Sequence, residues 1–410
     1  MKIAVIGAGF TGLSAALQLS RNNHSVVIFE KEAKPGGLAG TFMLNNWHWH
    51  LEKHYHHWFT NDDYALSLIV DLGLKKHLVF PKTLTSVYYS EVSYPFNSPI
   101  DVLNFYPLSV LDRIRTGLVL LYLKTLPPQL AIQLEKTSAC EWLKSWFGDS
   151  AYKILWEPLL LGKFGKYAKS VNMAWFWARI KKRTPSLGYL EGGYHKLVEA
   201  IVADIRKHGG KFYFETSFSK QLLDKYDKVI VTTPSSVFAE IFSAKVTSIP
   251  HLHALNLLLV TREKILPDVY WLNINDRRFP FIAVVQQTNL IDSKYYSNQH
   301  IAWIANYLPP DHPYLKMSKE QLFKLYLPYL KKINPSFNFE LCTLNFELFF
   351  GPFAQPVFPI DYSKIKPDFT TPIPNVYLAN MDMVYPWDRG TNYAIELGER
   401  IAHLIDSKKI

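Results

Sequence analysis

The N-terminal segment carries the pattern that most constrains the fold: an apolar run, three spaced glycines, an apolar helix and a second run ending in an acid. Residues 3–6 are mostly β-branched, as in a strand buried in a parallel sheet. Gly7 predicts a tight turn, Gly9 lets the backbone approach a pyrophosphate, and Gly12 lets the helix lie close to the strand. Glu30 ends the second run, where a carboxylate can accept both ribose hydroxyls. The pattern predicts a dinucleotide site, and the alternative is a glycine-rich turn without a ligand.

The composition fits a folded chain of two domains or one large composite unit. Of its 410 residues, 48% are hydrophobic and 15% aromatic, which is enough for a large core. Cys140 and Cys342 lie far apart and show no metal or disulfide spacing, which favours a reduced compartment. Because Met1 leads directly into the first predicted strand, we expect no signal peptide and a cytoplasmic location.

The sequence also bears on partners. No segment reaches the roughly 18 apolar residues that a membrane span needs. Aromatic residues 175–177 precede basic residues 181–183, a combination that suits peripheral contact with a lipid surface. The alternative is a solvated basic surface, in keeping with a diffuse net charge of +10. We expect a small-molecule substrate and no nucleic-acid partner, since no nucleic-acid module is present; the pattern leaves the oligomeric state open.

Two later segments complete the predicted nucleotide-binding unit. Gly192 and Gly193 precede an amphipathic helix and two strands, and the chain closes with a strand at 376–380 and a helix at 390–405. We therefore predict an α/β fold: a discontinuous Rossmann-like dinucleotide-binding domain with an inserted α+β substrate domain. The predicted bounds are 1–80, 186–245 and 371–410 for the first domain, and 81–185 and 246–370 for the second. Further helices are expected at 63–72, 108–124, 138–147, 150–160 and 318–332, and strands at 86–94, 255–260, 281–286 and 301–306.

Four motifs together resemble the flavin-dependent amine oxidase superfamily, which includes protoporphyrinogen oxidases, phytoene-type desaturases and UDP-galactopyranose mutases. They are the N-terminal glycines with Glu30, the basic-and-glycine stretch at 34–41, the Gly192-Gly193 segment, and residues 390–400. The resemblance implies FAD in a domain of the glutathione-reductase type. It implies non-covalent binding, because no cysteine lies near the closing motif.

The resemblance also assigns cofactor contacts by position. Asp382 is a departure, because the family's usual acid-bearing motif is here Asn380-Met381-Asp382. If Thr391 and Asn392 form the first turn of the closing helix, its N–H groups would face flavin N1 and the C2 carbonyl. The implied cofactor-binding residues are Gly7, Gly9, Gly12, Glu30, Lys31, Gly36, Gly37, Leu38, Ala39, Thr41, Phe218, Asp382, Arg389, Gly390, Thr391 and Asn392.

A histidine- and tryptophan-rich segment at 47–59 allows three interpretations. A metal site needs convergent ligands, and none pair obviously downstream. An aromatic hairpin, with His48 and His50 on one face of a strand, would be purely structural. The third interpretation is implied by the resemblance: relatives carry a Gly-x-His segment at a similar distance beside the flavin. The segment would then be a pocket wall over the flavin, and His54 or His56 would be the catalytic residue that donates to the flavin or moves a substrate proton.

Other polar candidates are less distinct. Asp388 is most simply a cap of the closing helix, or else binds FAD or an anionic substrate together with Arg389. Four arginines are candidates for binding a carboxylate or diphosphate, and the sequence does not choose among them: Arg179, Arg262, Arg277 and Arg278.

These observations favour an FAD-dependent oxidoreductase that takes a hydride from an amine or CH–CH donor. There is no second dinucleotide fingerprint, so we expect oxygen or another diffusible acceptor to reoxidise the flavin. No pattern supports hydrolysis or phosphoryl transfer. Two alternatives are a flavin-dependent sugar-nucleotide mutase without net redox change, and a flavin-binding subunit without turnover.

Overall fold

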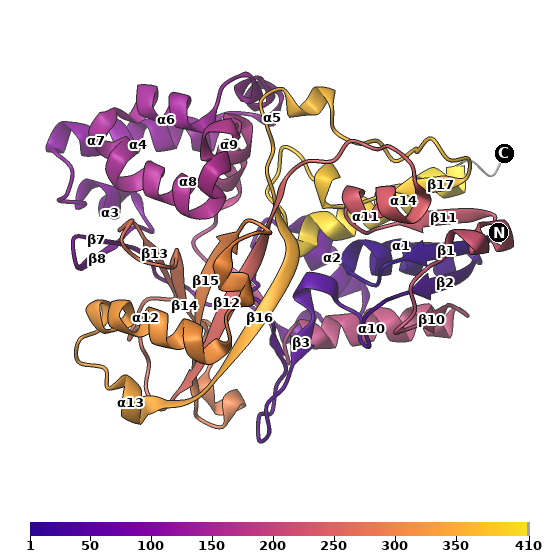
Figure 1. Cartoon of the computed structure of the whole chain (residues 1–410), viewed down its shortest axis with the longest axis horizontal. Helices are drawn as coiled ribbons and strands as arrows, with labels where there is room; N and C mark the ends of the chain where they lie inside the picture. The colour runs from indigo at the N-terminus through magenta and orange to yellow at the C-terminus, as the bar shows by residue number, and fades with distance from the viewer. Residues whose placement is uncertain (408–410) are drawn as a thin grey trace.

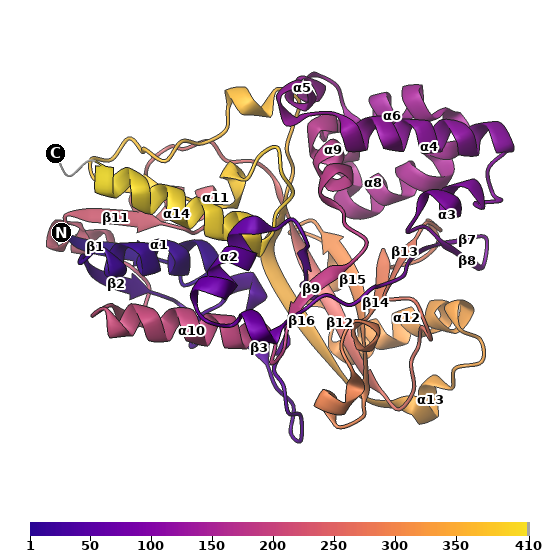
Figure 2. The same ribbon diagram turned by 180° about the vertical axis from the view of Figure 1, so that it is seen from behind.

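A computed structural model describes residues 1–407. The fold is mixed α/β, as predicted, and has three parts (Figure 1). A five-stranded sheet with its helices lies at one side of the molecule, a group of helices at the other, and a seven-stranded sheet beside both (Figures 1 and 2).

The five-stranded sheet is parallel throughout, in the order β10-β2-β1-β11-β17. Three segments that are distant in sequence supply its strands. The strands are β1 (Lys2–Ile6), β2 (Ser25–Phe29), β10 (Lys211–Tyr213), β11 (Lys228–Val231) and β17 (Val376–Leu378).

Apolar residues on both faces explain why these strands are central. Ile3 and Val5 of β1 pack into the core on the side of α1 (Phe10–Arg21), α10 (Tyr194–Lys207) and α14 (Thr391–Ser407). Ala4 and Ile6 pack into a second cluster with α11 (Ser235–Phe242). Because successive side chains point to opposite faces, a run that is apolar at every position suits a sheet covered on both sides.

Helix α14 lies directly against α1. A Cβ at Gly398 would come within 2.5 Å of the Thr11 carbonyl oxygen, so a glycine is needed where the two helices touch. Ser14 of α1 also donates to the carbonyl of Ile395 at 3.0 Å. The last helix therefore holds the first one in place.

The seven-stranded sheet has the order β16-β12-β15-β14-β13-β7-β8 and is antiparallel except between β13 and β7. The single strand expected at 86–94 is instead a hairpin, because Ser90 and Glu91 adopt positive φ and turn the chain. The strands are β7 (Thr85–Tyr89), β8 (Val92–Pro95), β12 (His251–Thr261), β13 (Trp271–Ile274), β14 (Ala283–Gln286), β15 (His300–Leu308) and β16 (Thr343–Pro356).

The helical part covers one end of this sheet. The helix expected at 150–160 is interrupted by a π-helical turn at Tyr152–Trp156, after which α8 begins with Pro158 in its first turn. The helices of this helical part are α3 (Pro99–Leu103), α4 (Val110–Thr125), α5 (Pro128–Ala131), α6 (Ala139–Phe147), α7 (Asp149–Ala151), α8 (Glu157–Phe164) and α9 (Met173–Lys182).

Shorter elements join these parts. The remaining strands are β3 (Thr41–Phe42), β4 (Leu51–Glu52), β5 (Trp58–Phe59), β6 (Leu78–Val79) and β9 (Leu187–Leu190), and the remaining helices are α2 (Asp63–Asp71), α12 (Lys319–Ile333) and α13 (Phe339–Cys342).

Trp175, Phe176 and Trp177 are buried in α9, with at most 2% of each residue exposed. The interpretation of these aromatic residues as a lipid-facing surface is therefore wrong: both faces of α9 are covered at this point, and only the basic residues that follow reach solvent. Among residues 1–407, no helix is long and apolar enough to cross a membrane.

Candidate active site

A pocket of about 1980 Å³ opens at the carboxyl ends of β1, β2 and β11, where they face β12, β15 and helices α8 and α9. In parallel sheets this edge is the usual ligand position. A single drug-sized ligand fills roughly 300–1,000 Å³, so this pocket has room for a dinucleotide and a second molecule. All the predicted cofactor-binding residues except Gly12 line it, as do His54 and His56.

The glycines form a cradle in which side chains would collide. Gly7 has φ +101°, and a Cβ there would lie 2.6 Å from Thr232 Oγ1. Gly37 has φ +56°, and its Cβ would lie 3.1 Å from the Cα of Gly9. A Cβ at Gly9 would meet no atom within 4 Å, because Gly9 borders the open pocket. Backbone alone can therefore approach a ligand here, which fits a pyrophosphate above the N-terminus of α1.

The implied contact of Gly12 with the cofactor is not found in the structure. A Cβ at this position would lie 2.0 Å from the Gly7 carbonyl oxygen, and Gly12 does not line the pocket. Its role in this structure is the close packing of α1 against the turn after β1, which the sequence also predicts.

Glu30 lies at one end of the pocket and is 8% exposed. Its carboxylate accepts hydrogen bonds from the backbone N–H groups of Ala8, at 2.6 Å, and Glu32, at 2.9 Å. It thereby braces the turn after β1, and each oxygen keeps a lone pair for a further donor. The exposed Lys31 ammonium lies 3.8 Å from the Glu32 carboxylate.

Phe218 closes this end of the pocket from the other side. Its ring packs edge-to-face on Phe29, with the ring centroids 5.3 Å apart. The residue is buried, so its ring shapes the wall rather than projecting freely into the pocket.

The N-terminus of α14 also faces the pocket. Thr391 Oγ1 accepts from Trp58 Nε1 at 2.9 Å, and Asn392 Oδ1 accepts from the backbone N–H of Ala65 at 3.0 Å. These contacts fix the first turn, whose backbone N–H groups have no partner within the helix. The arrangement fits a group that gathers negative charge at this point. Because α14 begins at Thr391, Gly390 precedes the first turn, and the interpretation of Asp388 as the helix cap is wrong.

Asp382 is fully enclosed in a polar network at the pocket wall. Its carboxylate accepts from Ser235 Oγ at 2.5 Å and contacts His251 Nε2 at 2.7 Å. Asn380 donates to Ser235 Oγ at 3.1 Å and completes the network. Ser235 therefore holds one oxygen of Asp382, while the other, Oδ1, is close to His251 but forms no hydrogen bond at the pocket wall.

The histidine segment is a loop followed by a short strand, not one long strand. Trp47, His48 and His50 lie in an irregular loop outside any strand, so the shared strand face expected for the two histidines is wrong; the strand β4 begins only at Leu51. His50 instead stacks on His195, with ring centroids 3.7 Å apart. Among residues 1–407 no group of three or more histidine, cysteine or acidic side chains is arranged to hold a metal.

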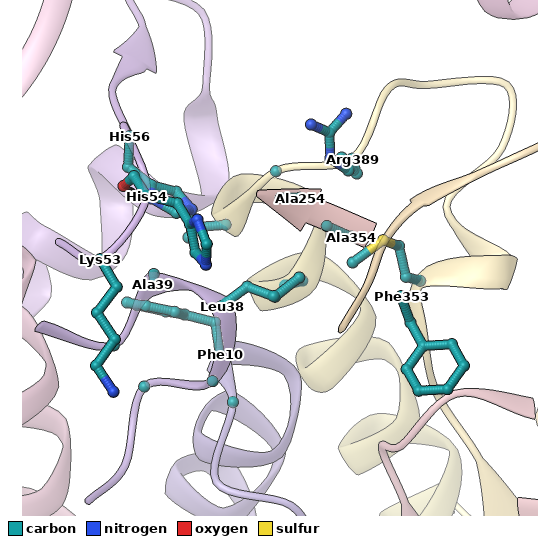
Figure 3. A pocket seen from close by; sticks show the side chains of 18 of the residues that line it. Phe10, Leu38, Ala39, Lys53, His54, His56, Ala254, Phe353, Ala354 and Arg389 are labelled. Carbon is teal, nitrogen blue, oxygen red and sulfur yellow. Dashed lines mark hydrogen bonds between the residues drawn. The ribbon is translucent and has the colours of Figure 1, made fainter. Parts of the chain in front are cut away.

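His54 and His56 lie on one side of the pocket, with Leu38 beside them and Arg389 across from them (Figure 3). The side-chain amide of Asn256, on β12, lies 2.8 Å from His54 Nδ1, which leaves Nε2 for another partner. His56 Nδ1 lies 2.7 Å from the carbonyl oxygen of His54.

Burial lowers the pKa of His54 to about 3, with help from the nearby His56 and Lys53. Burial likewise lowers the pKa of His56 to about 4. Both imidazoles are therefore neutral at pH 7. This favours a hydrogen-bonding role over the proton transfer near neutral pH that the sequence suggested.

The far side of the pocket carries a basic cluster, defined as Lys163, Arg179 and Arg389. Arg389 donates to Tyr307 Oη and Gln355 Oε1, and Arg179 forms an ion pair with Asp388.

Among residues 1–407, no carboxylate forms an ion pair with Lys163. Lys163 is 6% exposed, and its ammonium lies 4.8 Å from the centre of the Tyr307 ring. Burial, with the charges of Arg179 and Arg389, lowers its pKa well below the usual value. Burial opposes ionisation of Asp388, but the positive charges of Arg179, Lys163 and Arg389 outweigh it and lower the Asp388 pKa. Two arginines against one aspartate leave this side of the pocket positive in either protonation state of Lys163.

Of the four arginines proposed from the sequence, only Arg179 lines the pocket. Arg277 and Arg278 pair with Glu157 and Asp276 at the surface, and Arg262 is exposed. Sequence reasoning missed three pocket residues, Asn256, Lys163 and Tyr307. The available signal was a polar residue inside an apolar run, as at Asn256 in β12 and Lys163 in α8.

The family model for flavin-containing amine oxidoreductases matches residues 10–405. The chain therefore belongs to this family, and its cofactor is FAD, as the sequence predicts. The glycine cradle and the two helix N-termini fit such a dinucleotide.

Among curated proteins, the chain is 24% identical over 295 residues to coproporphyrinogen III oxidase of Staphylococcus aureus, covering 58% of this chain and 62% of that protein. Among solved structures, a putative protoporphyrinogen oxidase from Exiguobacterium matches with a TM-score of 0.76 at 15% identity, over 100% of this chain and 99% of that one. Reduced UDP-galactopyranose mutase matches with a TM-score of 0.73 at 16% identity, over 100% and 94%. These structural matches show the fold and leave the substrate open.

Proposed function

We propose that this chain is an FAD-dependent oxidoreductase that takes a hydride from a small organic donor carrying an anionic group. The observation that carries the proposal is that one pocket joins the glycine cradle to a second compartment bordered by His54 and the basic cluster. Bound FAD would supply the hydride acceptor. Oxygen or another diffusible molecule would then remove the electrons.

The chain's own residues would have three tasks. Asn256 fixes the orientation of His54, and a neutral His54 can donate one hydrogen bond from Nε2 toward the cofactor or substrate. The basic cluster can hold a carboxylate or phosphate, since bidentate guanidinium contacts are well suited to such groups. Tyr55 and Tyr307, whose hydroxyls lie 3.0 Å apart, extend this polar wall.

The test uses the purified, flavin-bound chain mixed without oxygen with candidate donors. Coproporphyrinogen III is the first, because a relative is named for it and it carries carboxylates; putrescine, a cation, is the opposite probe. We expect an anionic donor to bleach the visible flavin absorbance, and admission of air to restore it. A chain that purifies colourless and rejects added FAD would overturn the proposal.

The basic cluster also favours a second candidate, a flavin-dependent sugar-nucleotide mutase. Arg179 and Arg389 lie on the same wall of the pocket and would suit a diphosphate. If UDP-galactopyranose is isomerised only after dithionite reduction, and no donor bleaches the flavin, the chain is a mutase and the oxidoreductase proposal is wrong. A flavin that no donor bleaches in a chain that isomerises nothing would support the non-catalytic subunit.

A further inference from the structure

Helix α4 exposes an apolar stripe on its outer side. Leu111 is 79% exposed, Leu118 62% and Leu121 59%, and Ile114 and Tyr122 are also exposed. Residues spaced by three or four positions share one side of a helix. The opposite side, with Thr116, Val119 and Leu123, is buried against the other helices. The exposed stripe is thus additional to the side that holds α4 in the fold.

Neighbouring elements extend the stripe into a wider surface. Trp146 of α6 is 44% exposed and stacks on Tyr122, with ring centroids 5.3 Å apart and the rings nearly parallel. Together with Leu111, Ile114 and Leu118, Trp146 lines a groove along α4. We define the α4 face as Leu111, Ile114, Leu118, Leu121, Tyr122 and Trp146. Contiguous apolar surface of this kind marks an interaction site.

Basic side chains flank the α4 face. Arg113 donates to the carbonyl of Leu103 at 2.7 Å, Arg115 to that of Trp146 at 2.6 Å, and Lys124 to that of Arg183 at 2.5 Å. These partners are carbonyl oxygens, and in the part of the chain that the structure describes none of the three cations forms an ion pair with a carboxylate. Arg113 and Arg115 keep further N–H donors for an anionic partner at the edge of the face, whereas Lys124, which also donates to the carbonyls of Ile180 and Lys181, contributes its charge alone.

We infer that the α4 face docks on the surface of an anionic lipid membrane. An apolar stripe, an aromatic pair at its margin and cations on both sides are what an interfacial helix needs. Tyr122 and Trp146 are the residue types that settle at the headgroup level. The proposal places the lipid contact on α4, in place of the buried aromatic residues of α9, and it does not depend on the reaction proposed above.

The test is flotation of the full, flavin-bound chain with phosphatidylcholine vesicles, with and without phosphatidylglycerol. We expect the chain to float with the anionic vesicles and at least about ten-fold less with the zwitterionic ones, since each basic residue near an anionic surface adds attraction. The Trp146 emission should shift to the blue on binding. Added salt should weaken the binding.

Matched variants distinguish binding through the α4 face from nonspecific binding of other exposed apolar residues. Leu111→Asp with Leu118→Asp should lower binding about ten-fold or more. Leu341→Asp with Leu344→Asp changes two exposed leucines at α13 and β16 and should leave binding unchanged. Flavin content and the unfolding midpoint show that each variant is folded. The proposal is overturned if the wild type does not float with anionic vesicles at low salt, or if both double variants float equally. It is also overturned if light scattering shows a dimer that the α4 variant dissociates, since the occupant is then a second copy.

Discussion

The two sides of the pocket are built in different ways. On the cofactor side, the turns at Gly7 and Gly37 and the first turn of α14 present backbone to the ligand, and the side chains of Glu30 and Phe218 lie at one end. On the substrate side, single side chains such as Asn256 and Lys163 project from β12 and α8. A backbone wall tolerates no added side chain, whereas a side-chain wall can be exchanged one group at a time. The cofactor side is therefore suited to one ligand, and the substrate side can change without loss of the fold.

The largest predicted effect is the loss of bound flavin when a glycine of the backbone wall is replaced. Gly37→Val should lower the flavin content of the purified chain at least about ten-fold, because the new side chain meets Gly9 and closes the cradle. Gly165→Val is the control: Gly165 has a similar φ, +52°, but its Cβ would meet no atom within 4 Å. Visible absorbance per protein measures the difference. Equal flavin content in the two variants would show that strain alone, not the wall, limits binding.

A smaller and more selective effect is expected on the side-chain wall. Asn256→Leu should keep its flavin but slow flavin reduction by the donor about ten- to hundred-fold, because His54 loses the group that orients it. Asn306→Leu is the matched control: Asn306 is buried in β15 of the same sheet but bonds to Tyr326 and Pro280 and does not line the pocket. Stopped-flow measurement of both variants checks the prediction, which fails if they slow the step equally.

The same division explains what the sequence could reveal. The cofactor wall comes from local motifs, so Gly7 could be located from spacing, and Gly37 and the start of α14 from their resemblance to motifs of the family. The substrate wall unites residues of β12, α8, α9 and the segment before α14, whose positions depend on how the sheets pack. Nothing local to Lys163 or Asn256 predicts that they meet one pocket. The sequence does not predict the burial of residues 175–177 for the same reason: it does not show which helices cover α9.

The smallest predicted effect is a pH dependence of stability, and it comes from Glu52, a buried residue of β4 within the histidine- and tryptophan-rich segment. Its carboxylate accepts from the Tyr194 backbone N–H at 2.7 Å and from Tyr189 Oη at 2.8 Å, and burial raises its pKa to about 7. At pH values between the ordinary pKa of a glutamate and about 7, Glu52 carries a proton in the folded chain but not in the unfolded chain. The contribution of Glu52 to the free energy of unfolding therefore falls as the pH rises through that range.

Glu52→Gln should remove this pH dependence. From pH 5 to pH 8 the wild type should lose a few degrees of unfolding midpoint relative to the variant. Glu141→Gln, which changes an exposed carboxylate of α6, should follow the wild type. Thermal unfolding at several pH values tests this prediction. If the unfolding midpoints of the wild type and Glu52→Gln change with pH in parallel, the prediction is wrong.

The order of the five-stranded sheet has a consequence for how the protein is made. The central strand β1 pairs with β11, more than 220 residues later (Ile3 with Lys228), and β11 pairs with β17 near the end of the chain. Pairings so distant in sequence form slowly. During synthesis α1 waits until α14 (Thr391–Ser407) has left the ribosome. The cradle beside β1 and α1 can thus be completed only after the residues of the substrate side of the pocket have been made, so flavin loading follows the synthesis of that side.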